Sequence, residues 1–160
     1  MNENAIISPD TLEELNGRYL LFYIDNALYG VSLALVLEII QIQTITRLPG
    51  VPAYIKGIVN LRGKVVPVID VRTKFHLPER PYDDKTCIVV LDIHDLHIGL
   101  IVDSVSEVVT VESEQLTAPP DVGDAATRYL SSVSEVGDRV ILNIDFDKFF
   151  QNDIDTIRLQ

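Results

Sequence analysis

The chain has 160 residues, of which 47% are hydrophobic and 23% charged, a balance that allows a buried core and excludes a disordered chain. Its net charge of −11 argues against nucleic acid and anionic lipid as partners, because both select for basic surface. No apolar run is as long as a membrane span, no secretory signal pattern opens the sequence, and Cys87 is the single cysteine. We therefore expect a cytoplasmic globular protein without an internal disulfide.

Residues 1–17 are expected to form an N-terminal tail, partly disordered or with a short helix at Asp10–Leu15, where Asp10 and Glu13 give a weak capping signal. Strand-like runs follow from residue 18 onward, each rich in aliphatic and aromatic residues and bounded by Gly, Pro, Asn or Asp. They read YLLFYI, IVNL, VVPVI, CIVVLDI and RVILNI. This pattern indicates a mainly β fold.

Turns and helix starts can also be placed. Hairpins are predicted at IDNALYG, DIHDLHIG and NLRGKV, the last with a positive φ at Gly63. Pro67 lacks an amide N–H, so its strand should lie at a sheet edge or carry a bulge. Asp70 and Asp145 each precede a short segment that ends in Phe, which is typical of helix N-caps.

The sequence contains two similar halves. Tyr29–Ile39 matches Ile98–Val108 at an offset of 69 residues, with glycine, valine and glutamate at equivalent positions. Two similar segments, VPVIDVRTKF and LNIDFDKFF, end at Phe75 and Phe150, at an offset of 75 residues. Ordered identities in two separate blocks predict a duplicated fold, which we interpret as two similar five-stranded β-barrels with a few short helices.

Charge is unevenly distributed between the halves. Eight basic and four acidic residues lie between Arg47 and Lys85, whereas eight acidic and no basic residues lie between Thr86 and Thr127. Such asymmetry can orient protein partners, although chance clustering on a solvated surface explains the counts at least as well.

No catalytic, metal or cofactor site is predicted. The histidines of HDLH, His94 and His97, align with a hairpin tip of the first half and lack further ligands, so a solvated turn is favoured over a zinc site. Asp70 and Asp145 could form a carboxylate pair of a small hydrolase, but helix capping explains them better. A β-barrel nucleic-acid binder is disfavoured because the chain is acidic and has no Trp.

The segment LALVLEIIQIQTITRLP contains more aliphatic side chains than one face of a strand can bury. Some of them should form an exposed apolar patch, a feature that usually marks protein contacts. Alternatively, the segment lies between the two barrels and is buried by both. The pattern alone leaves these alternatives open.

The run PAYIKGIVNLRGKVVPVIDVRTKF resembles the signature of the CheW family of chemotaxis coupling proteins. The resemblance extends through LFYIDNALYGVSLALVLEI, GLIVDSVSEVV, EQLTAPP and YLSSVSEVGDRVILNIDFDKF, over roughly residues 18–150. It implies two SH3-like five-stranded β-barrels that pack closely in one domain, followed by a C-terminal tail at residues 151–160. This agrees with the duplication.

The resemblance also implies a function. Proteins of this family are non-enzymatic adaptors that bind the regulatory domain of the histidine kinase CheA and the cytoplasmic hairpin tip of methyl-accepting chemotaxis proteins. They also pack against other CheW-like domains in rings, so the protein would lie at the inner membrane through receptor arrays without inserting into it. A CheW-like coupler in a non-flagellar pathway, controlling pili, development or a second messenger, is the alternative.

Site residues follow from the same resemblance. The groove for the receptor would involve Val36, Glu38, Ile39, Arg62, Val105 and Val108. Glu38 could hold Arg62 in place as an ion pair, although from the residues alone Arg62 is simply an exposed turn arginine. Contacts with the kinase would involve Ile42, Ile45, Asp121 and Val122.

Overall fold

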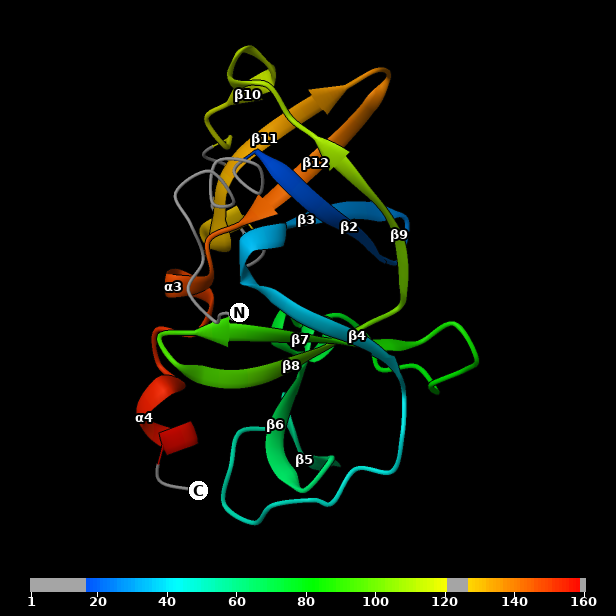
Figure 1. The fold of residues 1–160 in the computed structure, drawn as a ribbon, viewed down its shortest axis with the longest axis vertical. Helices are drawn as coiled ribbons and strands as arrows, with labels where there is room; N and C mark the ends of the chain where they lie inside the picture. Colours follow the sequence, from blue (N-terminus) through cyan, green and yellow to red (C-terminus); the bar gives the residue numbers. More distant parts are fainter. Residues whose placement is uncertain (1–16, 121–126, 159–160) are drawn as a thin grey trace, which may run out of the picture.

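The structure is a computed structural model that describes residues 17–120 and 127–158. Its strands form two sheets, one above the other in Figure 1. The upper sheet, called the first barrel below, has the order β10-β11-β12-β3-β2-β9, and the second barrel has the order β4-β7-β8-β6-β5. The predicted mainly β fold with few short helices is confirmed, and the first barrel gains one very short strand, β10.

The strands of the first barrel are β2 (Arg18–Ile24), β3 (Ala27–Ser32), β9 (Ser104–Thr110), β10 (Leu116–Thr117), β11 (Leu130–Val136) and β12 (Arg139–Ile144). Those of the second barrel are β4 (Val36–Gln41), β5 (Ile55–Leu61), β6 (Lys64–Asp70), β7 (Cys87–Ile93) and β8 (Leu96–Val102). The helical segments are η1 (Leu33–Leu35), α2 (Val71–Lys74), η2 (Ser113–Gln115), η3 (Thr127–Tyr129), α3 (Phe146–Phe149) and α4 (Ile154–Arg158). In the part of the chain described, no helix combines the length and apolar character needed to cross a bilayer.

The two sequence halves do not coincide with the two barrels. Each barrel takes one hairpin from one half and its remaining strands from the other: β2–β3 joins β9–β12, and β7–β8 joins β4–β6. Four pairings join strands of different halves: the parallel pairings of β3 with β12 and of β6 with β8, and the antiparallel pairings of β2 with β9 and of β4 with β7. Because the halves are interleaved in this way, neither barrel can be formed by one half of the chain alone.

Strand register repeats with the sequence offsets. Gly30 pairs with Asn143 in the first barrel, and the equivalent Gly99 pairs with Val68 in the second. Likewise Phe22 pairs with Val105, and Leu91 pairs with Val36. Both of the latter ladders carry a register shift at equivalent places. In the β4–β7 ladder the shift lies just after Val36, and in the β2–β9 ladder it lies between Leu20 and Phe22 of β2. The duplication inferred from sequence identities therefore extends to backbone pairing.

The predicted turns are present, with one correction. Arg62 and Gly63 both have positive φ, 52° and 86°, and the Asn60 carboxamide oxygen accepts a hydrogen bond from the Gly63 N–H at 2.9 Å. β6, however, is not an edge strand, because it pairs with both β5 and β8. Pro67 fits there because the pairing with β8 begins only at Val68, and the register shift lies in β5 instead.

Both predicted helix caps are confirmed. The Asp70 carboxylate accepts a hydrogen bond from the Thr73 N–H at the start of α2, and Asp145 accepts two from the first turn of α3. Within the predicted C-terminal tail, residues 151–158 are described, and Asp153 and Ile157 among them are buried. The predicted helix at Asp10–Leu15 lies outside the described residues.

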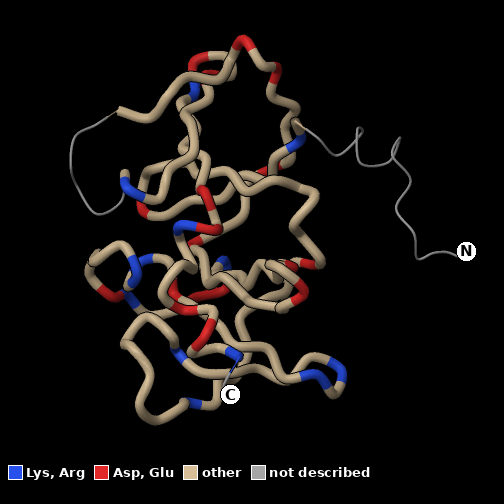
Figure 2. Tube along the Cα trace, turned by 90° about the vertical axis from the view of Figure 1, so that its left-hand side faces the viewer, with Lys and Arg blue, Asp and Glu red and all other residues tan. Residues whose placement is uncertain are grey.

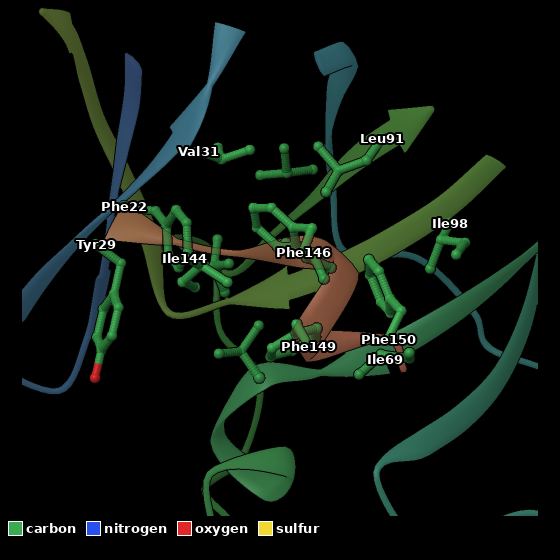
Figure 3. Close-up of a cluster of buried hydrophobic side chains, with 14 of the residues drawn as sticks. Phe22, Tyr29, Val31, Ile69, Leu91, Ile98, Ile144, Phe146, Phe149 and Phe150 are labelled. Atoms are coloured by element: carbon green, nitrogen blue, oxygen red, sulfur yellow. The ribbon is translucent and has the colours of Figure 1, made fainter. Parts of the chain in front are cut away.

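The largest hydrophobic cluster lies between the barrels, not inside either one. Figure 3 shows Phe146 and Phe149 of α3 and Phe150, which follows the helix, between strands of the first barrel, with Phe22, and strands of the second, with Leu91. Phe149 is fully buried and makes edge-to-face contacts with Phe150 and Phe146. Smaller clusters fill the two barrel interiors. The inter-barrel cluster thus fixes the barrels relative to each other.

Buried charges also join the barrels. Arg72 of α2 donates from Nη1 to Asp103 Oδ2 at 2.8 Å, from Nε to the Pro78 carbonyl at 3.0 Å, and pairs with Asp25 in the β2–β3 turn. Beside it, the Lys74 ammonium lies 2.6 Å from Asp153 Oδ2 and 4.1 Å from the Tyr54 ring centroid.

The contact between hairpin tip and helix recurs with the carboxylate on the helix and not on the hairpin tip. His94 stands at the position equivalent to Asp25, and Asp147 at the position equivalent to Arg72. The His94 Nε2 lies 2.6 Å from Asp147 Oδ1, and both side chains are largely exposed. Each barrel therefore has a hairpin tip paired with the helix that follows the other barrel's last strand, once through the buried Arg72 and once between two exposed side chains.

Candidate protein-binding surface

β4 and β9 are two edge strands that present aliphatic side chains to solvent, and the short edge strand β10 presents a third such side chain, Leu116. Each pairs on one side only, β4 with β7 and β9 with β2, in the sheets as described. Leu37 and Ile39 on β4 are 47% and 43% exposed, and Val108 on β9 is 47% exposed. The predicted exposed apolar patch is therefore present. The alternative, complete burial of this segment between the barrels, is wrong for Leu37 and Ile39.

The two edge strands approach each other at Cys87. Cys87 pairs with Gln41 at the end of β4, and its sulfur interacts with the backbone N–H of Val105 in β9. Figure 1 shows the start of β9 beside the end of β4 at the junction of the barrels. The exposed aliphatic residues of both strands thus belong to one region of the surface, which we call the edge surface (Leu37, Ile39 and Val108), with the half-buried Val105 next to them.

Cys87 provides a chemical probe of this junction. Burial raises the pKa of its thiol, and the N–H of Val105 opposes that effect only in part. Less thiolate is therefore present at a given pH, and the contribution of this group to stability is lost as the pH rises from the ordinary thiol pKa through the raised one. We expect Cys87 to react with iodoacetamide at pH 8 several-fold more slowly than the same thiol in urea, as followed by mass spectrometry. Equal rates would contradict this burial.

Glu38 and Arg62 form the predicted ion pair, which lies beside the edge surface. Their hydrogen bond raises the pKa of Arg62. The Arg62 side chain is 75% exposed because it projects from the β5–β6 turn. Leu37 and Leu61 line the same shallow groove as this pair, together with Val90 of the barrel wall. The groove therefore combines aliphatic walls with a guanidinium that can donate further hydrogen bonds.

The first barrel carries an equivalent ion pair that sequence reasoning missed. Glu107 corresponds to Glu38, and its Oε1 lies 2.9 Å from Nη1 of Arg139, in the β12 strand. The identity of Glu38 and Glu107 within the repeat was a signal for it. The cation could not be found in the same way, because Arg139 is equivalent to Lys64 and not to Arg62.

The structure separates the remaining site residues. Val36 and Val105 are half-buried against the inter-barrel core, whereas Ile39 and Val108 are exposed. Ile42 and Ile45, predicted to contact a kinase, are half-buried against the interior cluster of the second barrel. Asp121 and Val122 lie outside the described residues.

The histidines and aspartates with possible chemistry have structural roles. His94 and Asp95 form the β7–β8 turn with φ values of 51° and 69°. His97 contacts Lys64, its Nδ1 lying 2.7 Å from the ammonium. Asp70 caps α2 and also accepts a hydrogen bond from the Tyr82 hydroxyl at 2.7 Å. Among the described residues, no group of three possible ligands is placed to hold a metal ion.

The fold and surface together define a double-barrel β protein with exposed aliphatic edge strands. The family model for the CheW-like domain matches residues 18–153. The chain is 33% identical over 150 residues to the chemotaxis protein CheW of Klebsiella aerogenes, covering 93% of this chain and 90% of that protein. It is 38% identical over 104 residues to the chemotaxis protein CheW of Bacillus subtilis, covering 65% and 67%.

A solved structure agrees with these relatives. The crystal structure of the scaffolding protein TtCheW from Thermoanaerobacter tengcongensis superimposes with a TM-score of 0.78 at 31% identity, covering 86% of this chain and 94% of that one. The chain belongs to the CheW family of chemotaxis coupling proteins. The resemblance read from the sequence and the two SH3-like barrels that it implied are both confirmed.

Proposed function

We propose that this protein is a non-enzymatic adaptor of a bacterial chemosensory array. It links the cytoplasmic hairpin tip of methyl-accepting chemotaxis proteins to the regulatory domain of a CheA-type histidine kinase, and it lies in the cytoplasm at the membrane through these partners. Family membership supports the proposal, since relatives are described as chemotaxis and scaffolding proteins. The observation that carries it is the exposed aliphatic edge surface beside the Glu38–Arg62 pair.

The edge surface suits a helical partner. A receptor hairpin presents an apolar stripe at helical spacing, and Ile39 and Val108 can bury against such a stripe without rearranging the core. Val36 and Val105, half-buried behind them, support the strands that carry these side chains. Arg62 can donate hydrogen bonds to carboxylates or to helix carbonyls of the partner, while Glu38 holds its orientation.

The kinase would contact other faces. We retain Ile42 and Ile45 of the second barrel, and Asp121 and Val122, as proposed kinase contacts. Because Ile42 and Ile45 also pack against the barrel interior, variants at these positions need a stability measurement beside any binding measurement.

The proposal is tested by co-sedimentation of the purified protein with receptor-bearing membranes and the CheA kinase of its own organism. We expect the protein to pellet with receptors, and the kinase to pellet with receptors more strongly when the protein is present. Failure to join either partner would contradict the proposed function while leaving the fold and family unaffected.

Arg62→Ala tests the role of the guanidinium. We expect receptor affinity to fall by about 1–2 kcal/mol, roughly 5- to 30-fold in Kd, because a charge-assisted hydrogen bond is lost. Stability should change by less than about 0.5 kcal/mol, since Arg62 is exposed. The matched control is Arg139→Ala, which breaks the equivalent pair with Glu107 on the first barrel. Unchanged receptor binding by Arg62→Ala would remove this role.

A further inference from the structure

The two barrels carry equivalent outer grooves that differ in what covers them. The first-barrel groove lies where the β2–β3 turn meets β12 and is lined by Tyr23, Asn26, Ala27, Leu28, Arg139, Val140 and Leu142. The second barrel has a groove lined by the residues that correspond to these at the repeat offsets of 69 and 75 residues: Asp95, Leu96, His97, Lys64, Val65 and Pro67. The exposed valines match closely, with Val140 55% exposed and Val65 56% exposed.

In the second barrel, the chain itself contributes to the groove. Ile157 and Arg158 of α4 line it, and Ile157 is only 7% exposed. Figure 1 shows α4 next to the β7–β8 hairpin. The helix is held there by Asp153, whose carboxylate binds both Lys74 and the Tyr54 hydroxyl. A short helical turn with one buried aliphatic side chain therefore fits a groove of this shape.

In the first barrel, none of the described segments lines the groove as α4 does in the second barrel. Tyr82 stands at the repeat position of Ile157, but its hydroxyl binds Asp70 and it does not line the first-barrel groove. Among residues 17–120 and 127–158, only β2, β3, β12 and the β2–β3 turn line that groove. Its aliphatic wall is therefore open to a partner.

The differences between the grooves indicate the chemistry of that partner. Leu28 stands at the position of His97, so the first-barrel groove is more apolar than the second. Asn26 stands at the position of Asp95, so the first-barrel groove lacks the carboxylate that lines the second groove together with Arg158. Arg139 remains as the cation: its Nη1 pairs with Glu107, and a guanidinium carries five N–H donors in all. An occupant here should therefore carry an acidic residue where α4 carries Arg158.

We propose that the first-barrel groove is a docking site for a partner protein's short amphipathic helical turn, which inserts one aliphatic side chain beside Val140 and Leu142 and places a carboxylate near Arg139. This is a helix-in-groove contact. It goes beyond the proposed function, because the groove is separate from the edge surface and shares no residue with it.

The test is an NMR titration of the ¹⁵N-labelled full chain. The probe is a synthetic peptide of residues 151–160 carrying Arg158→Glu, and the control peptide carries Ile157→Asp in addition. We expect saturable shifts of the Ala27, Leu28 and Val140 amides with the probe and none with the control. In the protein, Val140→Asp should weaken binding by roughly tenfold or more, whereas the matched Val65→Asp should leave it unchanged.

Three results would overturn the proposal. The first is the absence of saturable shifts in the groove at millimolar peptide. The second is equal binding of the probe and the Ile157→Asp peptide, or shifts confined to the edge surface. The third is binding that appears only after residues 1–16 are removed, which would mean that the groove is covered by the chain's own N-terminal segment.

Discussion

Arg72→Met is expected to lower the free energy of unfolding by about 3–5 kcal/mol, because it removes one partner of a buried ion pair and leaves the other charge with only the more distant Arg80 as a cationic partner. Asp103 is the charge left behind: its side chain is 9% exposed and its Oδ2 lies 2.8 Å from Arg72 Nη1. The loss should appear as a lower midpoint in urea unfolding. Because Arg72 also binds Asp25 in the first barrel, the junction between the barrels should open first.

Arg80→Met is the matched control for this variant. Arg80 also faces Asp103, but at 3.6 Å and with its side chain 42% exposed, so its loss should cost less than about 1 kcal/mol. Hydrogen exchange of β2 and β9 amides in Arg72→Met should rise more than exchange inside the second barrel. A midpoint within error of the unsubstituted protein would show that the Arg72 network does not hold the barrels together.

Val108→Asp is expected to abolish most receptor binding without unfolding the protein. A carboxylate at this position would be buried against an apolar stripe without a partner, at a cost of about 2–3 kcal/mol, or roughly 30- to 160-fold in Kd. Val108 is 47% exposed in the free protein, so its stability should change by less than about 0.5 kcal/mol. Co-sedimentation with receptor membranes and urea unfolding measure the two effects.

Val65→Asp is the control for Val108→Asp, since Val65 is an exposed valine outside both the edge surface and the first-barrel groove. It should retain receptor binding. If both variants bind receptor equally well, β9 is not part of the receptor contact. If Val108→Asp unfolds, the position belongs to the core.

Local features of the fold followed from the sequence because they depend on a few neighbouring residues. Asp70 and Asp145 were predicted as helix caps from the short segments that follow them. Gly63 was predicted in a hairpin turn because glycine adopts positive φ readily. The duplication was visible as matched identities at fixed offsets. Each of these predictions needed no knowledge of which strands are neighbours.

The exchange of strands between the halves could not be predicted in the same way. Both halves have the same strand pattern, so β3 is as compatible with β6 as with β12, and identities within the repeat do not distinguish the two partners. The side-chain pairs at the junction between the barrels could not be predicted from the sequence either. Asp25 and Arg72 are 47 residues apart in the sequence. Their equivalents, His94 and Asp147, are different residue types, so no identity within the repeat indicates the pair.

The candidate surface was predicted in part. The excess of aliphatic residues in β4 correctly indicated exposed side chains, and the Glu38–Arg62 pair formed as expected. Which aliphatic residues are exposed depends on the register shift between Val36 and Glu38, a feature of the pairing with β7 that the sequence of β4 does not show. Consequently, Leu37 was not among the predicted groove residues, although it is more exposed than Ile39.

The most direct test of the adaptor role is the phosphorylation rate of the CheA kinase in the presence of receptor membranes, measured with and without this protein and with and without attractant. The adaptor role predicts that the kinase responds to attractant only when the protein is present, and that Val108→Asp removes the response while Val65→Asp keeps it. A kinase that responds equally without the protein, or that ignores receptors at protein concentrations where both partners are bound, would contradict it.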